Sequence, residues 1–525
     1  MIKALIAAVM IVAHEPGYYT SLARHIQRWL KGSEVAAEVI TPAEMAAKLP
    51  SGKVAFLVGF NEPTDREMEI LAGYSQKGGK LVVFHSASPR LGSLMGVKPT
   101  GYKTAKYPGC WSRMDFVKEV PAGFPSQILQ SSTVLQTAAP IEGRSRVIAW
   151  WSDRTGKRPG EAAWLSSKQG YWMTHVLLAD GDETLKAQLA AAICGSVDGR
   201  LWDAAAAQKK RETEHLRTKE YAKRQIPRKG EIHAVWDHSG CGLYPGNWAK
   251  TFKVLQEARV TDLFVNVAGA GFAHYNSKVL PRSQIYANEG DQLKACLAAA
   301  KGTGIRVHAW VLCFTATRGS PQTAANMRKR GWMLKTVDGK ETEYLNPANG
   351  EVRRYILDAI DEICTSYPVD GVHLDFVRWY ERSEKPKNAA AVIGGFVASA
   401  RKTVGKGKWL TAAVLGKYPS CVASVGQDWE AWLDMNLVDY AVPMDYSEDM
   451  AKFESFLKQH AATKRHGGRI IAGLGVTANE SRLNAKGVID QIRLTRKYGL
   501  AGVSLFDLDT YLEKSIFPYL KLGIW

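Results

Sequence analysis

The chain has 525 residues, of which 46% are hydrophobic and 23% are charged, as in ordinary globular proteins. A chain of this length exceeds one compact core, so two or three domains are expected. No segment is low in complexity, which excludes a largely disordered chain. No run of 18 apolar residues occurs after the first segment, which excludes a predicted membrane-spanning helix there.

Part of the net charge of +18 is concentrated in one segment. Between Lys209 and Lys229 the sequence has nine Lys or Arg and three Glu. We interpret residues 201–229 as a basic, solvated helical linker, with association with an anionic cell wall or a membrane surface as the alternative. Because no recognised nucleic-acid-binding motif occurs, we expect no nucleic-acid partner.

Residues 1–13 fit two interpretations. Lys3 followed by the apolar run Ala4 to Ala13 fits a short signal peptide cleaved after Ala13, which predicts a secreted or periplasmic protein. Alternatively, Leu5 to Val12 is the first strand of an α/β domain, which leaves a cytoplasmic location open. Seven cysteines are scattered without a CxxC pair, so the chain has neither a disulfide framework nor a zinc motif.

Residues 14–200 predict a doubly wound α/β domain. Helices and apolar strands alternate, which predicts a small parallel sheet with helices on both faces. Residues 146–178 are strand-rich, and a closing helix is expected over 183–195. The predicted elements before them are a helix over 18–31, strands over 35–40, 53–60 and 80–85, and a helix over 66–76.

This pattern resembles the class I glutamine-amidotransferase-like domains. A working amidotransferase carries a Cys in the sharp turn after a central strand. Here that turn reads Phe84-His85-Ser86-Ala87-Ser88, which contains no Cys and no G-x-S-x-G context. We therefore expect residues 14–200 to be a non-catalytic accessory domain.

From residue 230 to 525 the sequence predicts a (β/α)8 TIM barrel. Eight strands alternate with helices, and the number and length fit this fold. The longest insertions, residues 268–290 and 315–349, follow strands two and three and belong on the C-terminal face. The predicted strands cover 232–237, 262–267, 306–314, 369–378, 409–415, 438–444, 469–474 and 501–506.

Acids and aromatic residues recur at the ends of these strands. Asp375 lies inside a strand, where a carboxylate is unfavourable unless it is paired or faces a cavity. Glycoside hydrolysis needs two carboxyl groups across the scissile bond. We predict that Asp375 and Asp445, on strands four and six, are the catalytic pair. Further candidate acids are Asp237, Glu381, Glu448 and Asp507.

The other strand-end residues are candidates for substrate binding. Arg378 could bind an acidic sugar substituent or keep a carboxylate ionised, and the aromatic residues could stack on sugar rings. Alternatives stay open: a structural Asp375–Arg378 ion pair, Asp445 bonded to loop backbone, and Trp310 in the core. The histidines lack zinc-binding spacing, so we expect no metal and no cofactor. The candidates are Asp237, His238, Asn266, Trp310, Arg378, Trp379, Tyr446 and Asp507.

Three motifs in order resemble a known family. They are Tyr344-Leu-Asn-Pro-Ala-Asn-Gly-Glu-Val-Arg, Val369-Asp-Gly-Val-His-Leu-Asp-Phe-Val-Arg-Trp and Val438-Asp-Tyr-Ala-Val-Pro-Met-Asp-Tyr. Residues 231–525 are similar to the bacterial glycosyl-hydrolase-like envelope proteins of the "family 10 glycosylhydrolase" type. The resemblance implies a barrel, an extracytoplasmic setting and a polysaccharide substrate, such as amino-sugar glycan strands. An envelope protein that binds carbohydrate without cleaving it is the alternative.

The strand at Asp375 also comes close to the chitinase strand D-G-x-D-x-D-x-E. His373 and Val377 stand where that motif has acids. Substrate-assisted chemistry of the chitinase type is therefore disfavoured, and we expect the proton donor to come from another strand.

Overall fold

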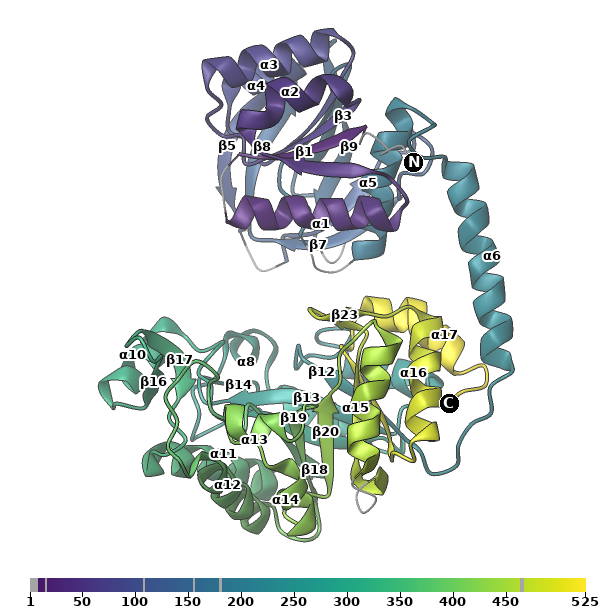
Figure 1. Cartoon of the computed structure of the whole chain (residues 1–525). Helices are drawn as coiled ribbons and strands as arrows, with labels where there is room; N and C mark the ends of the chain where they lie inside the picture. The colour runs from purple at the N-terminus through teal and green to yellow at the C-terminus, as the bar shows by residue number, and fades with distance from the viewer. Residues whose placement is uncertain (1–7, 15–16, 107–108, 154–155, 179–181, 463–466) are drawn as a thin grey trace. The chain divides into compact units, whose positions relative to one another are not determined.

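The computed structural model describes residues 8–14, 17–106, 109–153, 156–178, 182–462 and 467–525 (Figure 1). The chain divides into two compact units, Met1–His215 and Leu216–Trp525. The division lies within the segment predicted as a linker. Helix α6 (Ala204–Lys223) crosses it, and only Thr218 and Ala222 of this helix are buried.

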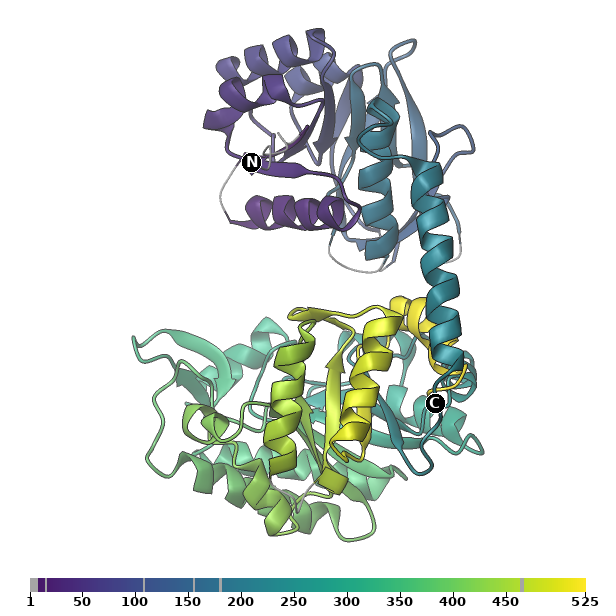
Figure 2. The same cartoon turned by 45° about the vertical axis from the view of Figure 1, so that its right-hand side comes forward.

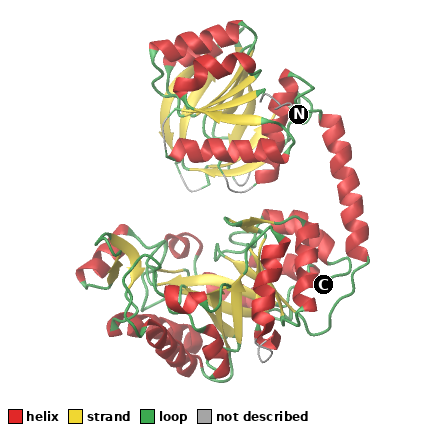
Figure 3. Cartoon of the chain, viewed as in Figure 1, coloured by secondary structure: helices red, strands yellow, loops and turns green. Residues whose placement is uncertain are grey.

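The first unit contains a nine-stranded sheet with helices on both faces, as Figure 3 shows. Five strands are parallel, in the order β2 (Ala37–Ile40), β1 (Val9–Ala13), β3 (Val54–Val58), β4 (Lys80–Phe84) and β11 (Gly170–Met173). The sheet continues antiparallel through β10 (Ala162–Ser167), β9 (Ser145–Ser152), β6 (Trp111–Phe116) and β7 (Gln127–Ser132). A separate antiparallel pair consists of β5 (Val97–Thr104) and β8 (Val134–Pro140).

Two hydrophobic cores lie on opposite faces of this sheet. Helices α1 (Tyr18–Gly32) and α5 (Glu183–Val197) contribute to one core. Helices α2 (Met45–Lys48), α3 (Asp65–Gln76) and α4 (Pro89–Met95) contribute to the other. The predicted helices on both faces and the strand-rich second part are confirmed. The sheet is larger than predicted and mixed, because four antiparallel strands extend its parallel part.

The structure bears on the two interpretations of residues 1–13. Val9–Ala13 form the fully buried strand β1, which pairs with β2 on one side and β3 on the other. Cleavage after Ala13 would remove this strand from the parallel sheet, so a signal peptide ending there conflicts with the fold. The first-strand interpretation is observed from Val9 onward, and residues 1–7 lie outside the described residues.

The second unit is a closed barrel of eight parallel strands (Figures 1 and 2). Strand β12 pairs with both β13 and β24, which closes the ring. The predicted TIM barrel is therefore confirmed. Its strands are β12 (Ile232–Asp237), β13 (Asp262–Gly269), β15 (Arg306–Leu312), β18 (Gly371–Asp375), β19 (Trp409–Leu415), β20 (Tyr440–Met444), β21 (Ile471–Gly475) and β24 (Gly502–Phe506).

Helices surround this ring, as expected for the fold. They are α7 (Trp248–Glu257), α9 (Gln292–Ala300), α11 (Gly350–Ser366), α12 (Ala389–Val404), α13 (Ser420–Val425), α14 (Trp429–Asp434), α15 (Met450–Ala462), α16 (Ala485–Lys497) and α17 (Phe517–Leu520). Among the described residues, no helix combines the length and the apolar character needed to cross a membrane. All seven cysteines lie within the described residues and are free thiols.

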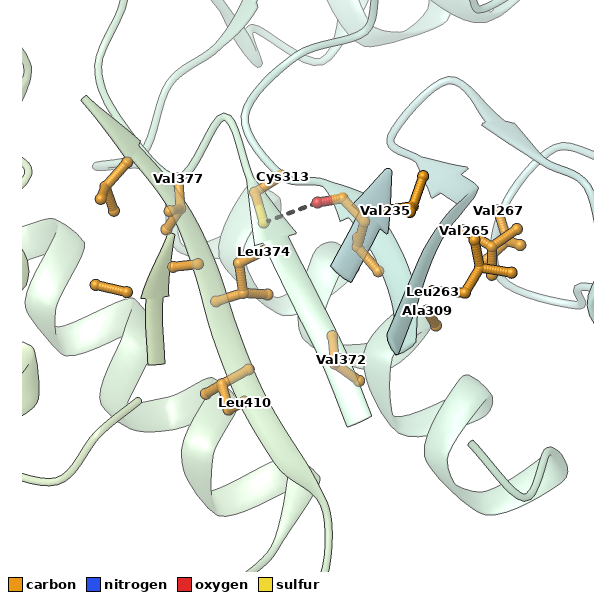
Figure 4. Packing of buried hydrophobic residues seen from close by; sticks show 14 of the residues in the cluster. Val235, Leu263, Val265, Val267, Ala309, Cys313, Val372, Leu374, Val377 and Leu410 are labelled. Carbon is orange, nitrogen blue, oxygen red and sulfur yellow. Dashed lines mark hydrogen bonds between the residues drawn. The ribbon is translucent and has the colours of Figure 1, made fainter. Parts of the chain in front are cut away.

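Strand alternation divides the barrel side chains into two layers. Val235, Leu263, Val372 and Leu374 belong to the outer layer, which packs against the helices (Figure 4). Each such aliphatic side chain contributes about 1.5–3 kcal/mol of burial free energy. The buried apolar residues of the inner layer are Ile232, Ala234, Trp236, Phe264, Trp310, Leu312, Val442 and Ile471, and Phe272 of the first insertion packs with them. Whether a strand-end residue faces inward or outward follows from this alternation.

The two long insertions lie at the carboxyl ends of the strands, as predicted. The first holds β14 (Phe272–Ala273) and α8 (Gln284–Glu289), and the second holds α10 (Pro321–Lys329), β16 (Met333–Lys335) and β17 (Glu341–Leu345). The insertions meet backbone to backbone, because a Cβ on Gly271 would lie 2.8 Å from the Cα of Gly319. Only glycine allows this approach.

Candidate active site

Asp375 ends strand β18 and faces the barrel interior. It shares the inward face with His373, whereas Val372 and Leu374 between them face the helices. The Trp310 indole Nε1–H donates to Asp375 Oδ2 at 3.2 Å, and the backbone N–H of Phe376 donates to Oδ1 at 2.6 Å. The inward orientation predicted for this carboxylate is therefore observed.

Arg378 provides the positive charge beside this carboxylate. Its Nη1 lies 3.8 Å from Asp375 Oδ1, which is an ion pair but longer than a hydrogen bond. Burial raises the pKa of Asp375, and Arg378 together with the N–H donors of Phe376 and Trp310 opposes that shift. These three groups stabilise the ionised form of the Asp375 carboxylate, although the side chain is buried.

His373 forms part of the buried floor beneath Asp375. Trp236 Nε1–H donates to His373 Nε2 at 2.9 Å, so the proton of the neutral ring is on Nδ1, which lies 2.8 Å from Thr411 Oγ1. Phe264 stacks on the ring with centroids 4.2 Å apart. Burial lowers the pKa of His373 well below its usual value. This histidine is a neutral core residue.

A second acid, Asp507, follows strand β24 at the same end of the barrel. Its Oδ1 accepts hydrogen bonds from the backbone N–H groups of His238 at 3.0 Å and Leu508 at 2.7 Å. Burial, together with the nearby acids Asp237 and Asp509, raises the pKa of Asp507 to about 8. Asp507 therefore holds a proton near neutral pH.

Tyr446 connects the surroundings of the two acids. Burial and the negative charges of Asp375 and Asp507 raise the pKa of Tyr446 well above its usual value. Glu480 and Asp445 raise this pKa as well.

Trp310 links the two acids through contacts: its indole donates to Asp375, and its ring contacts His238, whose backbone N–H donates to Asp507. Asp375 and Asp507, from strands four and eight, therefore border the same cluster.

Aromatic rings line this end of the barrel. Tyr446 contacts Phe506 and Trp236, with ring centroids 5.6 and 6.4 Å apart. His238 contacts Trp310 at 5.8 Å and Phe506 at 5.9 Å. The predicted residues Trp310, His238 and Tyr446 are brought together, whereas Phe506 was missed. Phe506 could have been predicted as a site residue, because it ends a barrel strand directly before Asp507.

Asn266 lies on the inner face of β13 with no exposed surface. Within the described part of the chain, neither its amide nitrogen nor its amide oxygen has a hydrogen-bond partner. A buried amide usually has partners, so this side chain is available to a water or a ligand. Its predicted role in substrate binding remains a prediction.

The structure corrects the prediction for Asp237. This residue is fully buried on the outward parity of β12, next to the inward-facing Trp236. Its carboxylate accepts hydrogen bonds from the backbone N–H groups of Ser239, Gly240 and Gly242 and from the Ser239 hydroxyl. Because these bonds occupy both oxygens, Asp237 shapes its own loop and is not positioned for substrate.

The prediction that Asp445 pairs with Asp375 is also corrected. β20 ends at Met444, and Asp445 follows with the outward parity. Its two oxygens lie 3.1 and 2.9 Å from Nε2 of His460 on α15, and both side chains are fully buried. Trp429 packs on the imidazole with centroids 5.6 Å apart. Asp445 therefore lies between the barrel wall and the helices.

Trp379 is a core residue and not a platform for sugar rings. It is 3% exposed, and its Nε1–H donates to the carbonyl of Ala389 on α12 at 3.4 Å. The strand predicted to run to Arg378 ends at Asp375, and Phe376 takes a φ of +50°. Because the backbone changes direction at Phe376, the strand alternation does not predict which way Trp379 faces.

We expect Trp379→Ala to destabilise the barrel by about 3–5 kcal/mol, because it removes a buried indole from the outer core. Chemical unfolding of the barrel should show this loss. Affinity for glycan, measured on the folded fraction, should stay within about twofold. A selective loss of glycan binding at unchanged stability would restore Trp379 to the site.

Two further candidate acids lie on the surface. Glu381 and Glu448 are exposed, and Glu448 Oε1 accepts a hydrogen bond from the backbone N–H of Arg482. Among the described residues, no group of three His, Cys, Asp or Glu side chains is arranged to hold a metal ion. The absence of a metal from the reaction stays a prediction.

Sequence reasoning missed Arg318, on the insertion that follows β15. Its Nη1–H donates to the carbonyl of His238 at 3.1 Å, and Asp507 is among the charges that act on it. The spacing of residues in a sequence does not predict where a loop side chain lies relative to a barrel. The position of Arg318 is therefore known only from the structure.

Fold and site together define a glycoside-hydrolase-like barrel. Residues 243–390 match the family described as "Glycosyl hydrolase-like 10", which confirms the predicted resemblance over this segment. The segment includes Asp375, Arg378, Trp310, Asn266 and Arg318. Glycosyl hydrolase DigH of Escherichia coli (strain K12) is 28% identical to this chain, over 23% of this chain and 31% of that protein. The match thus spans less than a third of the relative.

Solved structures of glycoside hydrolase barrels are also similar. The PgaB (BpsB) glycoside hydrolase domain from Bordetella bronchiseptica has a TM-score of 0.40 at 12% identity, covering 53% of this chain and 93% of that domain. The catalytic domain 2 of the Group II chitinase from Ostrinia furnacalis also has a TM-score of 0.40 at 12% identity, covering 56% and 95%. Similarity at this level does not define a substrate.

Proposed function

We propose that residues 230–525 are a glycoside hydrolase that cleaves a bacterial or environmental polysaccharide, amino-sugar glycan strands included. One observation carries the proposal: the Asp375 carboxylate faces the barrel interior at the end of strand four, bonded to Trp310 and flanked by Arg378. Inward-facing acids at the carboxyl ends of barrel strands are where this fold places catalysis.

In this proposal Asp507 replaces Asp445 as the second carboxyl group. Asp507 has a raised pKa and donates a proton to the leaving oxygen. Asp375, beside Arg378, is the ionised group that attacks the anomeric carbon or activates a water. Tyr446 supplies a flat face for a sugar ring, whereas Trp310 is 3% exposed and holds the Asp375 carboxylate. The expectation that the proton donor comes from another strand agrees with this assignment.

The raised pKa of Asp507 predicts the alkaline limb of the pH profile. In the folded chain Asp507 stays protonated up to about pH 8, so activity should hold through neutral pH and fall above about pH 8. The rate should drop about tenfold per pH unit on that limb. A kcat/KM profile between pH 5 and 10 tests this. Activity that stays constant to pH 10, or an Asp507→Asn variant with the same limb, would contradict the assignment.

A direct test of the proposed function is a screen of purified protein against polysaccharides, amino-sugar strands included, with products identified by mass. We expect shortened chains with a mass increase of one water per cleaved bond. Failure to cleave any of the glycans that the protein binds would favour the second candidate.

That second candidate is a carbohydrate-binding envelope protein without turnover. Two observations favour it: Asp445 faces the helices, and Val377 stands where the chitinase motif has its proton donor. Under this reading glycan binding survives both Asp375→Asn and Asp507→Asn, and no product forms with any variant.

We further propose that residues 14–200 are an amidotransferase-like accessory domain without its own catalysis. The turn after β4 contains no Cys, and the buried Ser86 hydroxyl donates to the carbonyl of Phe60. A secreted or periplasmic location, with the basic helix α6 near an anionic cell wall or membrane surface, fits a glycan substrate. Detection of the native protein in separated cell fractions tests this location.

A further inference from the structure

We propose that the first unit binds a free dipeptide with apolar side chains, in a cavity beside helix α3. The cavity has a volume of about 270 Å³ and lies between α3 and residues 46–52. The site lies within one unit and does not depend on the proposed action on glycans. It adds a ligand to a domain for which we propose no catalysis.

Gly73 opens this cavity. It lies inside α3, and its φ is not in the left-handed region. No other segment or side chain comes within 4 Å of the position that a Cβ would take. Glycine is a poor helix former, and here neither the backbone conformation nor a close contact requires it. The chain thus gives up helix stability at this position and leaves room for an outside group.

Opposite charges flank Gly73, one helical turn away on either side. Glu69 and Lys77 are exposed, line the cavity and lie on the same face of α3 as Gly73. Among the described residues, neither side chain has an ion-pair partner within 4.0 Å. The eight-residue spacing corresponds to about 12 Å along the helix axis, so the two charges do not pair with each other.

A zwitterion of suitable length would pair with both charges. Two charged hydrogen bonds of about 2.8 Å each take up roughly half of the separation. An extended peptide advances about 3.3–3.6 Å per residue, so two residues fill the rest. The ammonium group would bind Glu69, and the carboxylate would bind Lys77. A single amino acid is too short to reach both, and three residues are too long.

The walls of the cavity favour apolar side chains. Leu49 and Pro50 line it opposite α3, and Ile70 lines it on the helix. The volume corresponds to about nine molecules of liquid water. Replacing such water by apolar groups is favourable, so a dipeptide without apolar side chains would lose this contribution.

Tyr74 provides a hydroxyl group at the cavity wall. The residue is 7% exposed, and within the described part of the chain its hydroxyl has no hydrogen-bond partner. The tip of its ring lies on Gly79, which also lines the cavity, because a Cβ on Gly79 would lie 2.3 Å from Tyr74 Cζ. A buried tyrosine hydroxyl usually has a partner. The peptide group of a dipeptide would supply one.

Calorimetric titration of the full chain tests this site, with leucyl-leucine as the probe. Leucine and trileucine vary the length, and glycylglycine removes the apolar side chains. N-acetyl-leucyl-leucine lacks the ammonium group, and leucyl-leucinamide lacks the carboxylate. We expect leucyl-leucine to bind at least about fivefold more tightly than each of these compounds, because only it combines the matching length, both charges and apolar side chains.

Gly73→Met is the variant that fills the cavity. Methionine is a better helix former than glycine, and its Cβ meets no neighbour, so the unfolding midpoint should be unchanged or higher. Binding of leucyl-leucine should weaken at least about 50-fold, since the side chain occupies the ligand's place. Gly395→Met is the matched control, because Gly395 is an exposed glycine inside α12 with the same open surroundings. This control should bind leucyl-leucine like wild type.

Two charge variants assign the ends of the ligand. Glu69→Gln should weaken leucyl-leucine about three- to tenfold, the effect of losing a charged pair at an exposed rim, and leave N-acetyl-leucyl-leucine unchanged. Lys77→Gln should weaken leucyl-leucine to the same extent and leave leucyl-leucinamide unchanged. Tyr74→Phe should weaken leucyl-leucine about threefold or more, as expected for a lost hydrogen bond, without lowering the unfolding midpoint.

Three outcomes would overturn the inference. They are no binding of leucyl-leucine to the full chain, tighter binding of leucine or trileucine, and a Gly73→Met variant that binds like wild type. Charge variants that weaken the neutralised peptides as much as the free dipeptide would also contradict it. Because no readout uses glycan cleavage, these results are distinct from success or failure of the hydrolase proposal.

Discussion

Replacing Asp375 with Asn is expected to lower the rate of glycan cleavage by about 10³-fold or more, while the fold stays intact. Each tenfold loss corresponds to about 1.4 kcal/mol of activation free energy, so at least about 4 kcal/mol is expected. The loss follows because an amide can neither attack the anomeric carbon nor take a proton from water.

The loss of stability in this variant should be small beside the loss of rate. Asn keeps one oxygen, so it can accept only one of the two hydrogen bonds, because Trp310 and Phe376 donate to different oxygens of Asp375. Losing the other bond should cost about 1–3 kcal/mol. Asn has the shape of the carboxylate and no charge, so it avoids the cost of burying a charge at this position.

Product release from glycan strands and thermal unfolding are measured on the same preparation. Glu381→Gln is a matched control, since Glu381 is an exposed acid six residues further along. It should retain full activity. Full activity of the Asp375→Asn variant would reject Asp375 as a catalytic group.

Replacing Asp445 with Ala is expected to reduce stability strongly and leave the chemistry in place. Asp445 and His460 form a fully buried pair behind the barrel wall. Removing one member of a buried pair usually costs about 3–5 kcal/mol, because the other is left in a position built for its partner. For a barrel of this size the unfolding midpoint should fall by roughly 10 °C.

Urea unfolding followed by tryptophan fluorescence measures the stability, and turnover is corrected for the folded fraction. The rate per folded molecule should stay within about twofold of wild type. The milder Asp445→Asn variant keeps an oxygen toward His460 and should lose less stability than Asp445→Ala. Complete loss of turnover at unchanged stability would return Asp445 to the catalytic pair.

The sequence by itself was sufficient for the barrel and for one of its acids. Eight apolar strands separated by helices leave few alternative folds, because each strand must be covered on its outer face by a helix. Asp375 could be identified because residues alternate between the two faces of the strand. Val372 and Leu374 lie on one face, so His373 and Asp375 lie on the other. Local periodicity determines facing as long as the strand is regular.

Only the tertiary structure decided the partners of Asp375. Asp445 continues the alternation of its strand onto the outward face, and its partner His460 lies on a helix that follows. Trp379 lies four residues beyond Asp375, the last residue of its strand, where the alternation no longer predicts which way a side chain faces. The raised pKa of Asp507 depends on burial and in part on Asp237, which is distant in sequence. Arg318 reaches the site because two insertions meet at glycines. Distances across the ring depend on closure of the barrel, and no local pattern contains them.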